Sequence, residues 1–162
     1  MAIFSRKDLA LALVSAPKHP RLGGADLSEL DLRGLHLDGA QLPYADLSRA
    51  LLHDTHLQEV DFTGALLCFA QLQGADLTGA QLEADFTGAN LTRTVLNDAN
   101  LTRARLVDVN LSEASFVGAI LISAVLQGAS LTNVDFRQAN LEGAELENTN
   151  LEGSNFQGAN LS

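Results

Sequence analysis

The sequence predicts an all-β solenoid, a chain wound in coils around a leucine-filled interior. Three observations predict it: a large apolar residue at every fifth position, a small residue two positions earlier, and turn-forming residues in between. The apolar series runs from Leu27 to Leu82 and from Phe86 to Leu161, with 23 Leu and 5 Phe at its 28 positions. Ala stands two residues before 19 of these 28. A period of five fits neither the 3.6-residue turn of an α-helix nor a sustained strand.

The spacing has a direct physical meaning when each large apolar residue is taken as the centre i of a pentapeptide. In extended backbone, side chains i and i−2 point to one side and side chain i−1 points to the other. Leu and Ala therefore point inward, and the polar residue between them points outward. Positions i+1 and i+2 are mostly polar residues or Gly, which favour turns. A chain that turns after every three extended residues must coil, and stacked coils can pair as strands do.

The pentapeptides Ala75-Asp76-Leu77-Thr78-Gly79 and Ala139-Asn140-Leu141-Glu142-Gly143 resemble the motif of the pentapeptide-repeat family. The resemblance covers residues 25–162. It implies a right-handed quadrilateral β-helix with four pentapeptides in each coil. The 28 centres would then form about seven coils, and the rod would be roughly 34 Å long at the spacing of paired strands.

The two ends of the chain differ from each other. Residues 1–24 are predicted to be an N-terminal cap and linker, with a helix over Ser5–Ala16 that Ser5 caps and Pro17 ends. The repeats of residues 25–162 continue to Leu161, so the last coil is left open. An open solenoid end exposes apolar surface and unpaired backbone. We therefore expect either a homodimer formed through the C-terminal coil or a frayed end shielded by Glu142, Glu147 and Glu152.

One step of the repeat is a residue short. The centres Leu82 and Phe86 are four residues apart, whereas every other step has five. The corner between them therefore lacks one residue, and we expect a local kink or an altered turn there.

The charge of the chain limits its partners. The formal net charge is −10, from 20 acidic residues and 10 Lys and Arg. Direct binding to nucleic acid or to acidic membranes is not expected, because both need a basic surface. Residues 114–134 carry no charge and are long enough to span a membrane, but the repeat continues through their polar residues, which favours the solenoid. Cys68 alone cannot form an intrachain disulfide, which is typical of a cytoplasmic protein.

Three outward residues form a possible metal site. If residues 20 apart lie one above another, His36, His56 and Asp76 share one face of the solenoid. Imidazole and carboxylate groups bind divalent metals. However, no fourth ligand is evident and outward positions are usually solvated, so no metal and no cofactor are expected.

Apolar residues at outward positions are candidates for a protein interface. They form two clusters, Val117, Ile120, Ile122 and Val125 in one, and Leu66, Cys68 and Phe69, with Leu51 on the next face, in the other. Clustered exposed apolar residues mark protein contacts, although β-branched residues also suit an exposed ladder. A third outward set, Asn90, Asn110 and Asn150, shares one face, with Ser130 between, and is interpreted as side-chain stacking that satisfies polar groups.

No pattern of residues predicts catalysis. The sequence has no Gly-rich phosphate loop, zinc-ligand spacing or Ser-His-Asp arrangement above chance. We therefore expect a non-enzymatic scaffold or protein-binding module with an unidentified protein partner. The alternative, implied by the resemblance, is a DNA-mimicking binder of a type II topoisomerase such as DNA gyrase. Acidic residues are only ordinarily frequent here, and outward Asn and Gln dilute any phosphate-like array.

Overall fold

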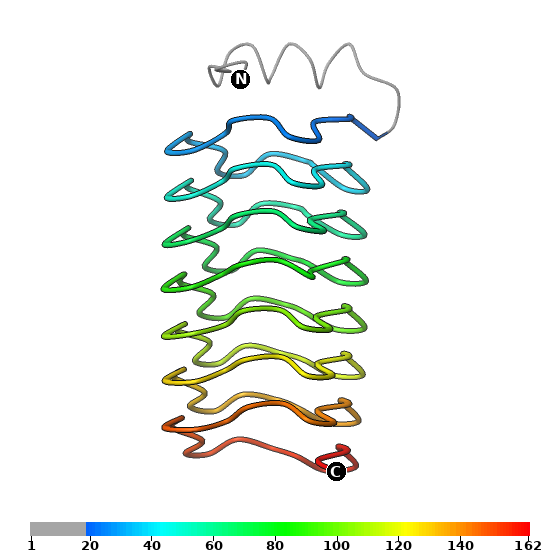
Figure 1. The fold of residues 1–162 in the computed structure, drawn as a ribbon, viewed down its shortest axis with the longest axis vertical. Coiled ribbons are helices and arrows are strands. Elements are labelled where there is room, and N and C mark those ends of the chain that lie inside the picture. The colour runs from blue at the N-terminus through cyan, green and yellow to red at the C-terminus, as the bar shows by residue number, and fades with distance from the viewer. Residues whose placement is uncertain (1–18) are drawn as a thin grey trace.

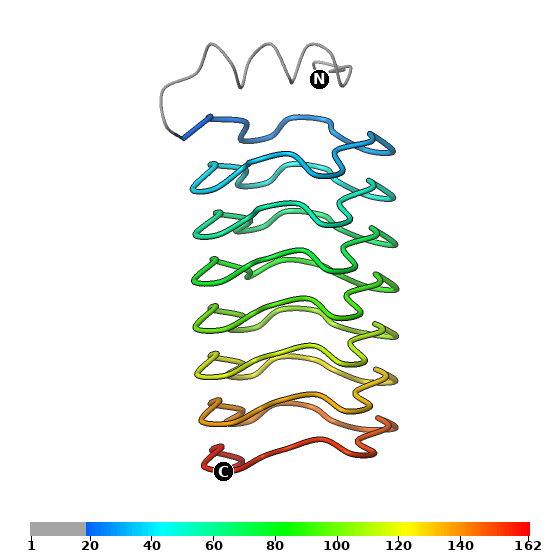
Figure 2. The same cartoon turned by 180° about the vertical axis from the view of Figure 1, so that it is seen from behind.

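The computed structural model describes residues 19–162, which form one stack of coils (Figure 1 and, from behind, Figure 2). Isolated parallel bridges join neighbouring coils, and the two residues of a bridge are usually 20 apart in the chain. They are 19 apart where the segment between them contains the four-residue step from Leu82 to Phe86. One coil therefore contains four pentapeptides. In residues 19–162 there is no helix, and no strand is longer than one bridged residue. Bridges occur at every fifth residue from 21 to 81 and from 85 to 160.

The four sides of the coil are named here by their bridged residues, which are the i−1 positions. Face A runs from Arg21 to Asn160, face B from Asp26 to Glu145, face C from Asp31 to Asn150, and face D from His36 to Asn155. On each face the coils are held by two backbone hydrogen bonds around the bridge. Leu77, for example, donates its N–H to Val95 O at 2.7 Å, and Val95 donates to Ala75 O at 3.0 Å.

The interior is filled as the pattern predicts. Every centre from Leu27 to Leu141 is at most 2% exposed, and most of the Ala residues at position i−2 are also buried. Burying a Leu or Phe side chain stabilises a protein by about 1.5–3 kcal/mol. The β-helix fold inferred from the sequence is thus confirmed by both its pairing and its core.

The outward polar residues stabilise their own pentapeptide. Asp or Asn at i−1 accepts hydrogen bonds from the backbone N–H, and often the hydroxyl, of residue i+1. Asp76, for example, accepts two hydrogen bonds at Oδ1, one from the backbone N–H of Thr78 at 3.0 Å and one from the Thr78 hydroxyl Oγ1 at 2.7 Å. Asn90, Asn110 and Asn150 bind residue i+1 in the same way. The bridges place these residues one above another, as expected, and each amide oxygen is satisfied within its own coil.

The corners place residue i+2 in the left-handed region of backbone conformation. In the corner after Leu77, Ala80 donates its N–H to Leu77 O at 3.1 Å, and Gly79 has φ of 70°. Positive φ at the third residue is what a type II turn requires. Twelve Gly residues and fifteen other residues have positive φ in the described chain. Glycine is thus not obligatory at these corners, although it adopts this conformation without steric cost.

The short step between Leu82 and Phe86 has an altered turn, as expected. Ala84 donates its N–H to Leu82 O at 2.7 Å, two residues back, whereas regular corners bond three residues back. The bridges on either side, Leu66 with Asp85 and Gln81 with Asn100, are both kept. The tighter turn therefore takes up the missing residue without breaking the ladder.

The ladder begins earlier than the sequence suggested. Arg21 forms a bridge with Gln41, and Leu22 is 8% exposed as a centre of face A. The predicted boundary at residue 25 therefore falls inside the first coil. The predicted helix over Ser5–Ala16 lies outside the described residues. Among residues 19–162, no helix has the length and apolar character needed to cross a membrane.

Candidate protein-binding surfaces and a histidine cluster

Three exposed apolar side chains lie on face B and at its two corners. Leu66 occupies an i−1 position of this face and is 46% exposed. Phe69, at the following corner, is 53% exposed, and Tyr44, at the preceding corner one coil earlier, is 72% exposed. The Tyr44 ring lies over Gly64, which is two residues before Leu66. We call Tyr44, Leu66 and Phe69 the face B patch.

The two aromatic residues of the face B patch are held in an unfavourable backbone conformation. Tyr44 and Phe69 both have φ of 59°. This left-handed region costs a non-glycine residue of order 1–2 kcal/mol, and thirteen other non-glycine corner residues of the described chain bear the same cost. The Phe69 ring lies over Gly88, and the guanidinium of Arg49 stands 5.8 Å from the ring centre. A Cβ at Gly88 would meet the ring at 2.5 Å, so the small residue makes room for it.

Sequence reasoning missed Tyr44 but found Phe69 at the same i+2 position, because Phe69 has Leu66 beside it in the sequence and Tyr44 has no outward apolar neighbour. The available signal was an aromatic residue where Gly and polar residues prevail. Leu51 lies on face C, as expected, and is half-buried. Cys68 is also half-buried, and burial together with the nearby Asp85 carboxylate raises the pKa of its thiol. A thiol with a raised pKa is a poor nucleophile at neutral pH.

The second apolar cluster is less exposed and is spread over three faces. Ile120 and Ile122 lie on face A, Val117 on face D and Val125 on face B. Ile120 is 39% exposed, and the other three are half-buried. We call Ile120 and Ile122 the face A pair.

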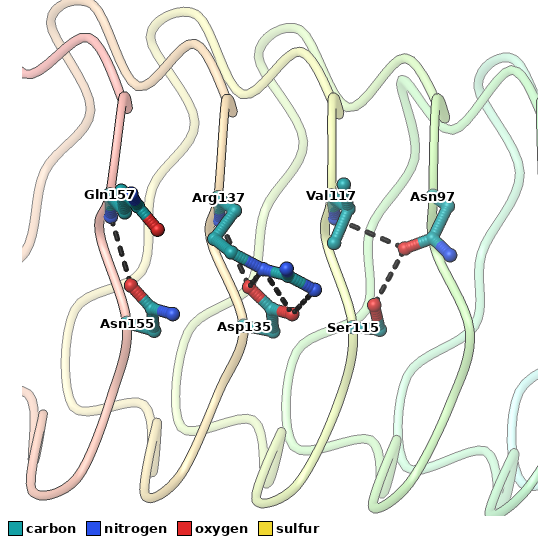
Figure 3. A network of polar contacts seen from close by, with 7 residues as sticks. All are labelled: Asn97, Ser115, Val117, Asp135, Arg137, Asn155 and Gln157. Atoms are coloured by element: carbon teal, nitrogen blue, oxygen red, sulfur yellow. Dashed lines mark hydrogen bonds and ion pairs between the residues drawn. The ribbon is translucent and has the colours of Figure 1, made fainter.

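Val117 belongs to a polar surface rather than to the face A pair. Figure 3 shows it between Asn97 and Arg137 on face D. Asn97 Oδ1 accepts hydrogen bonds from the Val117 N–H at 3.0 Å and from Ser115 Oγ at 2.6 Å. On the next coil Arg137 binds Asp135 through two nitrogens. The cluster predicted from the sequence is therefore divided by the corner of the coil.

The last coil of the described residues is less covered than the earlier coils. Leu161 is 58% exposed and Leu151 is 37% exposed, whereas centres in earlier coils are buried. Within residues 19–162, the backbone N–H groups of Leu146, Leu151, Phe156 and Leu161 have no backbone acceptor, although the corresponding groups of earlier coils do. Apolar side chains and free N–H groups are thus presented together at this end.

Two histidines form a cluster on face D, but with a different carboxylate from the one expected. The rings of His36 and His56 are stacked, with centroids 4.2 Å apart and an interplanar angle of 28°. Asp38 Oδ2 lies 3.9 Å from His36 Nδ1. His36, Asp38 and His56 each offer a ligand atom, and these atoms lie within 4.8 Å of one another.

Asp76 is engaged elsewhere. Its Oδ1 binds Thr78, and its Oδ2 accepts a hydrogen bond from Gln58 Nε2 at 2.7 Å. It is not part of the cluster that His36, Asp38 and His56 form. The grouping of His36 and His56 with Asp76 is therefore corrected to a grouping with Asp38.

Comparison with protein families agrees with the ladder. A model of pentapeptide repeats, with eight copies, matches residues 21–54 and 45–83, and a model of the pentapeptide repeat region matches residues 82–156. The chain belongs to the pentapeptide-repeat family. The two matches meet at residues 82–83, beside the short step. A search of curated proteins finds no match.

Solved structures show the same fold in other pentapeptide-repeat proteins. Rfr23 from the cyanobacterium Cyanothece 51142 has 22% identity and a TM-score of 0.50, over 84% of this chain and 90% of that one. A trypsin-treated variant of QnrB1, a plasmid-mediated fluoroquinolone resistance protein, has 23% identity and a TM-score of 0.51, over 88% of this chain and 79% of that one. HetL, involved in heterocyst differentiation regulation in the cyanobacterium Nostoc sp. PCC 7120, has 26% identity and a TM-score of 0.35, over 96% of each chain. The likeness to Rfr23 and QnrB1 concerns the fold alone, and nothing is argued from the match to HetL.

Proposed function

We propose that the protein is a non-enzymatic scaffold that binds a protein partner through the face B patch. The observation that carries this proposal is the pair of exposed aromatic residues, Tyr44 and Phe69, at corners with positive φ. Thirteen other non-glycine corner residues share this positive φ, so the backbone conformation does not distinguish the two aromatics. Their exposure does, because a large ring left in solvent forgoes the benefit of burial. A protein partner that covers the rings would recover that benefit.

The composition of the patch suits a protein interface. Aromatic residues and Arg are enriched in the centres of protein interfaces, and exposed apolar clusters mark contact sites. Arg49 over Phe69 adds a charged group at the edge of the patch. The face A pair is a smaller surface, because Ile120 is only 39% exposed and Ile122 is half-buried.

The experiment removes the patch while it restores the repeat pattern. The variant Leu66→Asn and Phe69→Gly places a typical outward residue at i−1 and the least strained residue at i+2. Its melting temperature should equal or exceed that of the wild type, and its capture of partners from the native host should be lost. The matched control is Ile120→Thr with Ile122→Thr. If the face B variant keeps the same partners and association state as the wild type, the proposal is wrong.

We infer further that a second copy binds the open C-terminal coil. The exposed Leu151 and Leu161 and the free N–H groups support this inference, because unpaired sheet edges usually recruit a partner. Glu142, Glu145 and Glu147 surround this end and would repel their counterparts, so association should strengthen with salt. Sedimentation of wild type and Leu151→Lys/Leu161→Lys at low and high salt tests it. A wild type that stays monomeric at high micromolar concentration contradicts it.

DNA mimicry is the alternative function, supported by the net charge of −10 and by the fold shared with a fluoroquinolone resistance protein. Two observations weigh against it. Arg side chains pair with the carboxylates of Asp31, Glu83, Asp85, Glu113 and Asp135, which reduces the charge presented to a partner. The i−1 column of face B is interrupted by Leu66, Arg105 and Val125. A DNA gyrase supercoiling assay with micromolar protein decides the matter, and an unaffected enzyme excludes mimicry.

A further inference from the structure

The histidine cluster on face D has the chemistry of a metal site. His36 and His56 occupy equivalent positions one coil apart, joined by a bridge, so the ladder itself sets their spacing. All three side chains of the cluster are exposed, and their ligand atoms lie within 4.8 Å of one another. We propose that His36, Asp38 and His56 bind one divalent transition-metal ion. This proposal is independent of the face B patch.

The stacked rings must rotate before both can bind one ion. Nitrogen ligands lie about 2.0–2.1 Å from zinc, so two nitrogens bound to one ion are roughly 3–4 Å apart. The ring centroids are already 4.2 Å apart, but the rings are only 28° from parallel, and the lone pair of an imidazole nitrogen lies in the plane of its ring. Both side chains are exposed, so rotation about their side-chain bonds can turn one nitrogen of each ring toward a common point while the bridge keeps the backbone spacing.

Asp38 is oriented for the third ligand position. Its Oδ1 accepts a hydrogen bond from the backbone N–H of Gln58 at 3.2 Å, across to the next coil. The other oxygen, Oδ2, is the one that faces His36 Nδ1 at 3.9 Å. A metal ligand whose orientation is already fixed by a hydrogen bond to a neighbouring group loses less conformational entropy when it binds the ion. Such hydrogen bonds also tune the affinity for the metal. One carboxylate oxygen is thus fixed to the ladder and the other is left for the metal.

The ligand set indicates which ions fit. Two imidazoles and one carboxylate favour Zn²⁺, Ni²⁺ or Cu²⁺ over Mg²⁺ and Ca²⁺, which prefer oxygen ligands throughout. Three protein ligands at the surface leave at least one coordination position for water. The affinity should therefore be moderate, and the ion should exchange with solvent.

The first experiment measures Zn²⁺ binding to the full chain, without any histidine tag and after removal of metal with EDTA. Titration calorimetry should show one ion per chain. His36→Ala and His56→Ala should each weaken binding at least about tenfold, by analogy with the effect of removing even outer groups from metal sites. His53→Ala is the matched control, because His53 belongs to the same coil as His56 but lies on face C. This substitution should leave the affinity for Zn²⁺ unchanged. Absence of saturable binding, or unchanged binding in either ligand variant, overturns the proposal.

The second experiment tests the choice of carboxylate. Asp38→Asn should weaken Zn²⁺ binding about tenfold, whereas Asp76→Asn should leave it unchanged. A thermal melt with and without Zn²⁺ provides an independent readout, since an ion that binds the folded state raises the melting temperature. The rise should be present in the wild type and His53→Ala and lost in His36→Ala. Loss of affinity in Asp76→Asn together with full affinity in Asp38→Asn overturns the assignment of Asp38, and full affinity in both variants overturns the three-ligand site.

Discussion

Three stacked phenylalanines in the last coils of face D should stabilise the rod beyond the effect of their burial. The rings of Phe116 and Phe136 have centroids 5.1 Å apart, and those of Phe136 and Phe156 are 4.9 Å apart, with interplanar angles of 17° and 14°. Phe62 is equally buried, but among the described residues it contacts no other aromatic ring. Among these buried residues, Phe62 therefore has no stacked ring beside it, Phe116 has one and Phe136 has two.

The perturbation is the same substitution at three positions, Phe62→Leu, Phe116→Leu and Phe136→Leu. Leu is the usual residue at these centres, so the loss of volume is similar in all three and cancels in the comparison. Each aromatic pair contributes about 0.5–1.5 kcal/mol beyond its buried area. Relative to Phe62→Leu, the free energy of unfolding should be lower by about 0.5–1.5 kcal/mol for Phe116→Leu and about 1–3 kcal/mol for Phe136→Leu.

The assay is equilibrium unfolding in urea followed by far-ultraviolet circular dichroism, since the chain has no Trp. The comparison requires equal m-values, because a smaller m-value would indicate that the C-terminal coils unfold separately. With equal m-values, Phe62→Leu should be the least destabilising substitution, Phe116→Leu should be intermediate and Phe136→Leu should be the most destabilising. If Phe136→Leu is no more destabilising than Phe62→Leu, the stacking contributes nothing and the reasoning is refuted.

Three further predictions concern the short step, acid stability and the thiol. A Gly inserted between Glu83 and Ala84 restores the five-residue corner, so the melting temperature should be equal or higher; a clear drop would show that the four-residue turn is required. Hydrogen bonding to Arg137 holds the pKa of Asp135 below its ordinary value of 3.8, so the stabilisation is present above that pH and is lost as the pH falls through the lowered value. Asp135→Asn should therefore lose less stability than the wild type in melts between about pH 5 and about pH 2.5, and equal losses would contradict this. Burial raises the pKa of the Cys68 thiol, so iodoacetamide should label the folded protein at about pH 8 more slowly than the urea-unfolded protein; equal rates would count against it.

The interior of this fold could be predicted from the sequence because each inward position obeys a single rule. Leu and Phe at every fifth residue and Ala two residues earlier place the core without reference to anything else in the chain. The family resemblance supplied the four sides of the coil, which the period of five does not determine. The start at Arg21 was missed because Pro20, two residues before Leu22, lacks the Ala that marks most repeats.

The outward positions were harder to predict, because they depend on side-chain torsion angles and on neighbours in adjacent coils. The columns correctly placed His36 above His56. The choice between Asp38 and Asp76 was decided by competing hydrogen bonds from Gln58 and Thr78, which the sequence alone does not reveal. The same limit explains why the Asn residues of face C bond within their own coil.

A regular solenoid separates stability from recognition more cleanly than most folds do. Inward positions are filled by one pattern, so an outward residue can change with little effect on the core. Positive φ is common to fifteen non-glycine corners and is explained by the fold, but an exposed aromatic ring at such a corner, as at Phe69, adds nothing to the core. Leu66 stands at an ordinary ladder position, and its substitution alone would not distinguish recognition from chance. The corner aromatics make that distinction, because replacing Phe69 by Gly should favour the fold and disfavour the complex.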